Sequence, residues 1–486
     1  MCSLSRSFVC SAFALMVALP PVLAACDDSS PAPATPAPAP TVSVPGADGG
    51  APSVGGKPDL DAMLRGGDCP AVTGAGVEHR GDITADEVWR ASDGVHRVTG
   101  LVRVLANVTL EACARVQVDE GGAFEVGSSQ SAGKLLTQGT LDGQKLLPVT
   151  IAASDAARPW GAIVVSALGT LDLSYTAIAG GDAPSSQQNG GGMVRVFGAS
   201  TPSTPGVPTV TKNIRSRWAL VDGARSIGVQ LLAYAGFTDD STGLAVRRTT
   251  GPAVLTLVGA VQALPSVLDL SGNVPDEVLV DQATAGVIDH TFRNLGVPYR
   301  AVDRINLQPV ADLPPVTMTI EAGVTLRFGD ARGSSGITVG ASATRQGRIV
   351  ARGTAAQPIT LTSAKDAKAA GDWRGIVFQE YPADGAAFEN VVFEYAGGDS
   401  STVGSGCGPS DNDATLLILG QRPSEAWVKS STFRFGAGQT GIVLGWTSDA
   451  DGPDFKSTNT FVEMPACQVS RWRSSTGCPA GGPTCL

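Results

Sequence analysis

The chain has 486 residues, of which 43% are hydrophobic, and this is enough to bury a core across one or two domains. Charged residues make up only 16% and aromatic residues 5%, while 60 Gly and 32 Pro interrupt the chain often. This composition argues against a helical bundle or a coiled coil. The formal charge of -10 and the lack of a basic run argue against a nucleic-acid partner.

Residues 1–25 have the pattern of a secretory signal sequence. One early cation, Arg6, precedes an apolar stretch that ends at Leu23, and small residues follow. The stretch is shorter than the ~18 to 20 residues that a membrane-spanning helix needs, and Pro20 and Pro21 interrupt it. We therefore expect an export signal and not a permanent transmembrane anchor.

The end of this segment, Leu23-Ala24-Ala25-Cys26, resembles the lipobox of bacterial lipoproteins. In those proteins signal peptidase II cleaves before a cysteine that carries a diacylglyceryl group. The resemblance implies that Cys26 is the lipidated first residue of the mature protein, held at a membrane by its acyl chains. The alternative is an ordinary secretory signal with a coincidental cysteine.

The sequence after Cys26 indicates a location and a tether. We expect an exported protein of the bacterial envelope, with the outer membrane or cell surface favoured over the periplasmic face of the inner membrane. Asp27, at the second mature position, resembles an enterobacterial signal for inner-membrane retention, but that rule varies between lineages, so the leaflet stays open. Residues 26–60 are rich in Pro, Ala and Gly and predict a semi-rigid, polyproline-like tether.

Six cysteines remain for disulfides once the signal and Cys26 are set aside: Cys69, Cys113, Cys407, Cys467, Cys478 and Cys485. In an oxidising compartment the default is three disulfides. We expect Cys69 with Cys113, because the other four all lie beyond residue 400, and then Cys407 with Cys467 and Cys478 with Cys485. A zinc site is the competing interpretation, but there is no Cys-x-x-Cys pair and no histidine near these cysteines.

The body of the chain, past residue 80, predicts a series of short strands. Runs of Val, Ile, Leu and Thr alternate with clusters of Gly, Asp, Asn, Ser and Pro, and no long segment keeps a helical period. The expected strands include 102–108, 115–118, 162–165, 193–197, 243–246, 375–378, 415–419 and 441–444.

The sequence also repeats itself. Thr109-Leu-Glu-Ala-Cys-Ala-Arg-Val-Gln-Val118 matches Thr319-Ile-Glu-Ala-Gly-Val-Thr-Leu-Arg-Phe328, and Trp160-Gly-Ala-Ile-Val-Val165 matches Trp373-Arg-Gly-Ile-Val-Phe378. A shorter pattern, an apolar strand followed by a small-residue turn such as Phe393-Glu-Tyr-Ala-Gly-Gly398, recurs more often. Each such unit predicts one coil of a stack, because a single coil cannot bury its own inward side chains.

The strings I-E-A-G-V-T-L-R-F, P-I-T-L-T-S, G-D-W-R-G-I-V-F and F-E-Y-A-G-G resemble the right-handed parallel β-helix proteins of bacterial cell envelopes, in the pectate-lyase-like superfamily. The resemblance implies an all-β solenoid. We expect an N-terminal cap at 61–100, a β-helix at 101–445 duplicated at about 101–198 and 311–445, and a Cys-rich C-terminal cap at 446–486. A seven-stranded antiparallel sandwich is the alternative, but the hairpin signals that it needs are scarce.

The sequence shows no convincing catalytic set. Polysaccharide-cleaving β-helices need a dense polar patch, either paired carboxylates or calcium-binding acids with an Arg or Lys base. The acidic doublet Asp239-Asp240 follows a coil turn and is typical of turn formers. The three histidines, His79, His96 and His290, lie in unrelated contexts, and no coenzyme motif occurs.

Two further features could bind ligands. The carboxylates of Asp449, Asp451 and Asp454 could converge on one Ca²⁺ ion, but a plain Asp-Gly turn explains this run and the similar run at 410–413 better. Exposed tryptophans could stack on sugars. Trp160 and Trp373, however, open apolar strands at equivalent places in the duplication, and we expect them in the core.

Two classes of function follow from these features. We expect a monomeric, lipid-anchored, non-enzymatic scaffold for adhesion or for binding a polysaccharide or an envelope or surface protein. The alternative is a carbohydrate-active enzyme, a polysaccharide lyase or a glycoside hydrolase. A groove that gathers three or more acidic and Arg or Lys side chains would favour the enzyme, whereas scattered polar residues would favour binding.

Overall fold

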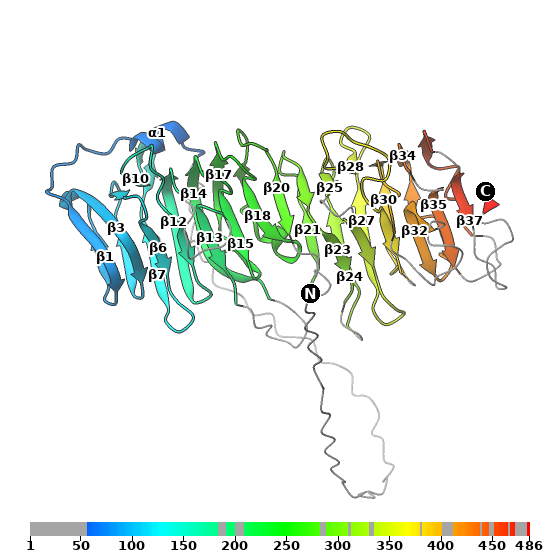
Figure 1. Cartoon of the computed structure of the whole chain (residues 1–486), viewed down its shortest axis with the longest axis horizontal. Helices are drawn as coiled ribbons and strands as arrows, with labels where there is room; N and C mark the ends of the chain where they lie inside the picture. Colours follow the sequence, from blue (N-terminus) through cyan, green and yellow to red (C-terminus); the bar gives the residue numbers. More distant parts are fainter. Residues whose placement is uncertain are drawn as a thin grey trace, which may run out of the picture. The chain divides into compact units, whose positions relative to one another are not determined.

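The computed structural model describes residues 56–486 with internal gaps at 183–190, 200–208, 282–287, 310–312, 330–334, 380–381, 401–411, 438–439, 447–451, 465–466 and 472–483. Short strands form successive coils that stack side by side (Figure 1). The named strands pair in parallel from coil to coil, except for the antiparallel pairs β8–β9 and β37–β38. This architecture is the parallel β-helix that the sequence predicted, and the antiparallel sandwich is wrong.

The strands form four columns, each column being the set of strands that lie one above another in successive coils. Column 1 contains β5 (Arg115–Val118), β10 (Val149–Ala153), β17 (Thr242–Arg247) and β19 (Leu268–Asp269). Column 2 contains β6 (Ala123–Val126), β11 (Ile163–Val165), β13 (Val194–Phe197), β15 (Val229–Leu232), β18 (Val254–Leu257), β20 (Val278–Asp281), β22 (Tyr299–Ala301), β25 (Thr325–Phe328), β28 (Ile359–Ser363), β31 (Val391–Glu394), β34 (Thr432–Arg434) and β36 (Thr460–Val462).

The other two columns complete the coils. Column 3 contains β2 (Glu87–Trp89), β4 (Asn107–Leu110), β7 (Gly133–Thr137), β16 (Ala235–Phe237), β21 (His290–Phe292), β24 (Val316–Ile320), β27 (Gly347–Arg352), β30 (Ala387–Glu389) and β33 (Val428–Lys429). Column 4 contains β23 (Arg304–Leu307), β26 (Gly336–Val339), β29 (Ile376–Phe378), β32 (Ala414–Gly420), β35 (Thr440–Trp446) and β37 (Cys467–Arg471). The longer strands β1 (Val77–Ile83), β3 (Val95–Val104), β12 (Gly169–Ala179) and β14 (Thr211–Asp222) each pass from one column to the next.

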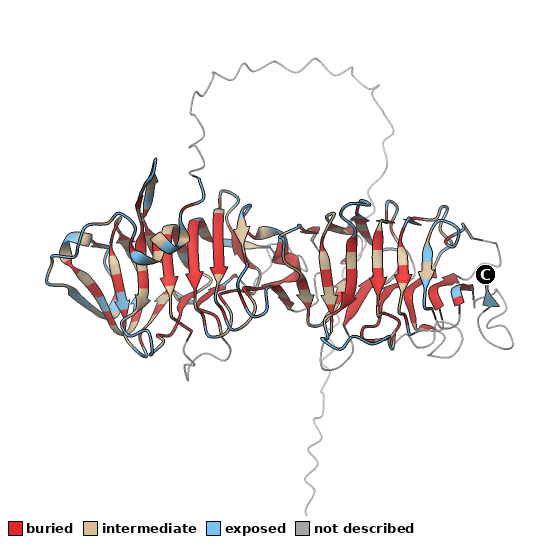
Figure 2. Ribbon diagram, turned by 90° about the horizontal axis from the view of Figure 1, so that it is seen from above, coloured by how far each residue is buried: buried red, intermediate tan, exposed pale blue. Residues whose placement is uncertain are grey.

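The core is a ladder of inward side chains that runs through column 2. Each member pairs with the equivalent residue one coil away, and nearly all are completely buried. The ladder consists of Val102, Phe124, Ile163, Val194, Val229, Val254, Val278, Tyr299, Leu326, Leu361, Phe393, Phe433 and Phe461. Its aromatic end is stacked, with ring centroids 4.6 Å apart for Phe393 and Phe433. Figure 2 shows the burial along the strands and the exposure of the turns.

The structure places the two copies of the sequence duplication in equivalent local settings. Trp160 and Trp373 are both fully buried, as the sequence predicted, and each indole N–H donates a hydrogen bond of 2.8 Å to a backbone carbonyl. Cys113 and Gly323, which match in the duplication, both have a positive φ, at 68° and 81°. Gly adopts this conformation readily, whereas Cys113, like several other non-glycine residues of the turns, adopts it at some cost.

The coil pattern changes once, near the middle of the stack. Column 1 ends at β19 and column 4 begins at β23, whereas column 2 continues from β20 to β22 without a break. The 3₁₀ helix η2 (Val258–Ala263) contacts β16 and β21 and so takes the place of a column 3 strand. The sequence resemblance is thin in this part of the chain, and the change of columns explains why.

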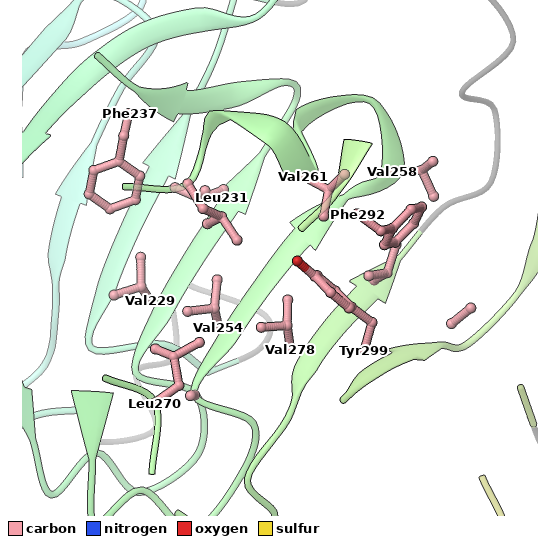
Figure 3. Close-up of a cluster of buried hydrophobic side chains, with 14 of the residues drawn as sticks. Val229, Leu231, Phe237, Val254, Val258, Val261, Leu270, Val278, Phe292 and Tyr299 are labelled. Atoms are coloured by element: carbon pink, nitrogen blue, oxygen red, sulfur yellow. The ribbon is translucent and has the colours of Figure 1, made fainter. Parts of the chain in front are cut away.

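The core remains continuous across this change (Figure 3). Val254, Val278 and Tyr299 follow one another in the column 2 ladder, and Val261 of η2 packs beside them. Phe292 meets Tyr299 edge to face at a centroid distance of 5.0 Å. The two halves therefore share one hydrophobic core.

A short helix, α1 (Leu60–Arg65), lies on the outside of column 1, and the sequence analysis did not predict it. Asp59 caps its N-terminus by accepting two backbone N–H bonds, and Gly66, with a φ of 91°, ends it. Met63 is fully buried against an outward row formed by Ala177, Leu220 and Ala245. No helix among the described residues is long and apolar enough to cross a bilayer.

We call residues 56–69 the strap, because they run along the outer face of column 1. Lys57 forms an ion pair of 2.7 Å with Asp269 of β19, the last strand of that column. At the other end, Cys69 forms a disulfide with Cys113, just before β5. The pairing of Cys69 with Cys113 is confirmed.

The C-terminal disulfide differs from the expected pairing. Cys467 of β37 is bonded to Cys485 of β38 (Thr484–Cys485), because β38 turns back antiparallel to β37 and brings the two together. The expected pairs Cys407 with Cys467 and Cys478 with Cys485 are therefore wrong, and Cys407 and Cys478 lie outside the described residues. The two disulfides indicate an extracytoplasmic protein.

The predicted caps need correction at both ends. Residues 77–100 contain β1, β2 and the 3₁₀ helix η1 (Ala91–Asp93), which belong to the first coil of the stack, and most of β3, which pairs in parallel with β1 and begins the second coil. The predicted C-terminal cap likewise contains β36 and β37, which add another coil in parallel register. Among the residues described there, β38 covers an edge, because it pairs with the side of β37 that faces away from β35. The hairpin of β8 (Thr140–Asp142) and β9 (Lys145–Leu147) projects from the first half.

Met63 packs the strap against the outer face of column 1, so Met63→Asp should detach the strap from that column. Removing this buried side chain costs about 2 to 5 kcal/mol, and the new charge faces an apolar row. We expect protease cleavage within 56–69 to become faster while the coils stay resistant, as measured by limited proteolysis with mass spectrometry. Arg65→Asp, on the exposed side of α1, is the matched control and should behave as wild type. Equal cleavage rates in both variants would refute the packing role.

The first coil encloses a histidine whose protonation should depend on folding. The His79 ring stacks on Trp89 with centroids 3.8 Å apart, and its Nε2 lies 3.0 Å from Nδ1 of His96. Burial, with a further contribution from His96, lowers the pKa of His79 to about 4, and Glu87, 3.8 Å away, opposes this only partly. The neutral ring is therefore the form that the fold stabilises.

Because the folded-state pKa is below the unfolded value of 6.5, His79 stabilises the fold above pH 6.5, and this contribution is lost as the pH falls from 6.5 to about 4. The shift corresponds to an upper limit of about 3 kcal/mol. We expect His79→Phe to lose less stability than wild type between pH 7 and pH 4, measured by urea unfolding at each pH. Identical pH dependence in the two proteins would contradict this assignment.

Candidate functional site

Most of the residues that the sequence proposed for anchoring and metal binding lie outside the described part of the chain. These are Leu23, Ala24, Ala25 and Cys26 of the lipobox, and Asp449 and Asp451. Asp454 is described, and its Oδ1 accepts the backbone N–H groups of Lys456 and Ser457 at 2.7 and 2.9 Å. These bonds lower its pKa, which is the behaviour of a turn-forming aspartate. Within the described ranges, no group of three or more His, Cys, Asp or Glu side chains could hold a metal ion.

The acidic doublet takes part in ion pairs between coils. Lys212 binds Asp239 at 2.6 Å, and Arg215 bridges Asp240 and the buried Asp172. The same arrangement recurs along the stack, for example between Glu277 and Arg300 and between Glu394 and Arg434. Parallel register brings such side chains close to each other one coil apart.

A polar groove near the N-terminal end gathers several charged residues. It has a volume of about 560 Å³ and is lined by Arg97, Gln117, Asp119, Glu120, Ser154, Asp155 and Arg158. Both oxygens of Asp119 lie 3.1 Å from Nε of Arg97. Arg158 reaches Glu120 at 3.4 Å and Asp155 at 3.6 Å. We call this the N-terminal groove, and it meets the criterion of three or more acidic and basic side chains in one place.

The electrostatics of the N-terminal groove oppose proton transfer. Hydrogen bonds from Ser154 and then Arg97 lower the pKa of Asp119, so this carboxylate stays ionised. Asp119 in turn raises the pKa of Arg97, and a guanidinium held charged in this way is a poor general base. The groove presents fixed charges that are already paired, which suits recognition of a polar ligand.

A second groove lies between two turns of the C-terminal half, and we call it the C-terminal groove. It has a volume of about 360 Å³, and the turns 382–386 and 421–425 form most of its lining, together with Gln346 and Trp427. Arg348 steadies the first turn by donating a hydrogen bond of 3.0 Å to the carbonyl oxygen of Asp384. Gln421, Arg422, Ser424 and Glu425 present exposed polar groups.

Trp427 forms the apolar part of the C-terminal groove. Its ring packs inward against Phe378, at a centroid distance of 4.9 Å, and against Phe388 and Phe455, both at 5.8 Å. It is 9% exposed, and no described residue accepts a hydrogen bond from its buried indole N–H. The N–H group is buried beneath the groove, so a ligand oxygen gains this hydrogen bond only where the lining side chains move apart to admit it.

His290 does not contribute to either groove. It is 1% exposed, and its Nδ1 lies 3.0 Å from the carbonyl oxygen of Ile288. Burial lowers its pKa, so the ring is neutral in the core between coils.

Sequence reasoning missed several buried charged residues. Asp172, Asp182, Glu277, Asp372 and Arg374 are all nearly inaccessible. Some of their partners come from a neighbouring coil, as Arg300 does for Glu277, and others from the preceding segment, as Lys365 does for Asp372, so no single linear motif shows them. The one available signal is a charged residue directly beside an otherwise apolar strand, as in the Trp373-Arg374-Gly375 run.

Comparison with known families supports the fold at one place in the chain. Residues 314–406 match the family model described as pectate-lyase like beta helix domain. This segment lies within the part of the chain, 311–445, where the repeated strings are clearest. The protein thus carries a pectate-lyase-like β-helix domain. No curated protein and no solved structure matches the chain significantly.

Proposed function

We propose that the protein is an exported, lipid-anchored β-helix that binds a glycan in its C-terminal groove without cleaving it. The observation that carries the proposal is the groove itself, where exposed polar side chains surround Trp427 with its unpartnered indole N–H. Sugars present hydroxyl groups that both donate and accept hydrogen bonds, and the Gln, Arg, Ser and Glu side chains of turn 421–425 offer both functions.

Binding is favoured over catalysis by the state of the acidic side chains. A glycoside hydrolase needs one carboxylic acid whose pKa is raised so that it can give a proton, opposite a second carboxylate. In the N-terminal groove the pKa of Asp119 is lowered, and its partners are Ser154 and Arg97. The charged side chains there form ion pairs with one another, and the same side chains can orient a polar ligand.

A carbohydrate-active enzyme is the second candidate, and the composition of the N-terminal groove is the observation that favours it. Three carboxylates and two guanidinium groups line one cavity on the outside of a β-helix. Lyases of this architecture combine acids with an Arg or Lys base, so this groove is the place to look for cleavage.

Trp427→Phe and Arg422→Ala should each weaken glycan binding about 3- to 10-fold, the range expected for losing one hydrogen bond. Phe keeps an aromatic ring to pack on Phe378 but loses the five-membered ring with its N–H, so the fold should persist at some cost in packing. The measurement is isothermal titration calorimetry with the tightest polysaccharide from a panel of neutral and acidic glycans. Trp160→Phe removes an indole N–H that is bonded to a backbone carbonyl far from the groove, and it should leave the affinity unchanged.

The same panel separates the two candidate functions. Release of reducing or unsaturated ends that disappears in Asp119→Asn would overturn the binding proposal in favour of an enzyme. Failure of the wild-type protein to bind any glycan in the panel would also reject it.

The lipid anchor is tested at Cys26. We expect wild-type protein expressed in bacteria to incorporate radiolabelled palmitate and to sediment with membranes, and Cys26→Ser to lose the label and become soluble. Cys10→Ser is the matched control, because this cysteine leaves with the signal and its loss should change nothing. A labelled Cys26→Ser protein, or an unlabelled wild type, would contradict the anchor.

A further inference from the structure

Arg374 is a buried arginine whose side chain lies across the outer face of column 4. It directly precedes Gly375 and β29, it is 2% exposed, and its backbone N–H donates to the carbonyl oxygen of Ser335 at 3.1 Å. A Cβ atom on Gly336 would come within 2.1 Å of Arg374 Cγ, so the glycine makes room for the side chain. The matching position in the other copy of the duplication is Gly161, so this arginine is particular to the C-terminal half.

The guanidinium group of Arg374 has donors that nothing in the described protein satisfies. Its Nε and Nη1 atoms are buried and have no hydrogen-bond partner. Nearby polar atoms share this condition: Oγ of Ser335, Oγ1 of Thr338 and Nε of Arg304 are also buried without a partner. Arg304 pairs directly with Gly336 between β23 and β26, and Thr338 is two residues further along on the same face of β26. The unsatisfied groups therefore gather on one patch of column 4.

Positive charge predominates around the unpartnered donors of this patch, because they belong to Arg374 and Arg304. Burial, followed by the charge of Arg304, lowers the pKa of Arg374 to about 10, and Asp399 and Asp413 oppose this only partly. Burial also disfavours the charged form of Asp413 and raises its pKa. Arg374 nevertheless stays protonated at neutral pH. Two buried donors of a cation without hydrogen-bond partners destabilise a protein unless acceptor atoms meet them, and Asp399 and Asp413 offset the charge without bonding Nε or Nη1.

We propose that Arg374, Arg304, Ser335 and Thr338 form a binding site for an oxyanion: a carboxylate, sulfate or phosphate group. Each of these anions carries a negative charge and several oxygens that accept hydrogen bonds. An anion at this site would therefore satisfy the unpartnered atoms of the two guanidinium groups and the two hydroxyl groups. The site lies on column 4 and shares no residue with the C-terminal groove, so it stands or fails independently of the proposed glycan binding.

Thermal unfolding of the purified full-length protein tests the site. The melting temperature of wild type should rise saturably with sodium sulfate, sodium phosphate or sodium glucuronate, compared with sodium chloride at equal ionic strength, because a ligand of the folded state stabilises it. Sulfate or phosphate as the effective anion indicates an inorganic ion, and glucuronate indicates an acidic sugar. Arg374→Met should abolish the saturable rise and, in chloride, be as stable as wild type or more so, since it removes a buried charge with two unsatisfied donors.

Arg352→Met is the matched control. Arg352 is a 58% exposed side chain paired with Glu389 at 3.3 Å, and its loss should leave the anion response intact. A rise of the melting temperature that is equal in wild type and Arg374→Met would be the general effect of excluded salts and would overturn the proposal.

A direct measurement covers the case in which Arg374→Met does not fold. Equilibrium dialysis of wild type against radiolabelled sulfate, phosphate or glucuronate should show about one bound ion per chain. Where Arg374→Met folds, its affinity should be at least tenfold weaker. Absence of stoichiometric binding of all three anions to wild type would reject the site.

Discussion

The parallel pairing of inward side chains from coil to coil is the interaction on which the structure depends. No coil buries its own inward residues, but each member of the column 2 ladder covers the member before it. Burial at about 25 cal/mol per Å² of apolar surface therefore accumulates along the stack. Because the strands carry this free energy, the turns between them can vary in length, and both grooves lie at such turns.

The same register constrains the outer faces. Outward residues also meet their equivalents one coil away, so like charges would repel and opposite charges pair, as Asp172 does with Arg215 and Glu277 with Arg300. Where the outward row is apolar, at Ala177, Leu220 and Ala245, it needs a cover, and α1 provides one. Pairing and covering leave few charged groups free for chemistry, and this is the physical basis for preferring a binding role.

Much of the fold could be predicted from the sequence, because strands and core positions follow local rules. The alternation of apolar residues located β5 and β13, and the duplicated motif indicated two equivalent buried tryptophans, Trp160 and Trp373. Cys69 had one available partner in the first 400 residues, so its disulfide followed by elimination. The pairing of Cys467 with Cys485 did not follow, because it depends on β38 lying antiparallel to β37, and a local turn signal does not specify which strand the following residues pair with.

The candidate sites were harder to predict because they join residues whose separation depends on turn length. Turns 382–386 and 421–425 meet in the C-terminal groove only because one coil separates them. Arg374 and Arg304 are further apart in sequence, yet both lie beside Gly336. The duplication also shows that equivalent positions in the fold can carry different residues with different roles. Its two copies keep equivalent positions but place Gly161 in one and Arg374 in the other, and Cys113 in one and Gly323 in the other. Because both copies keep the inward ladder and the backbone pairing between coils, positions at the corners and on the outside are free to take up a disulfide in one copy and a buried cation in the other.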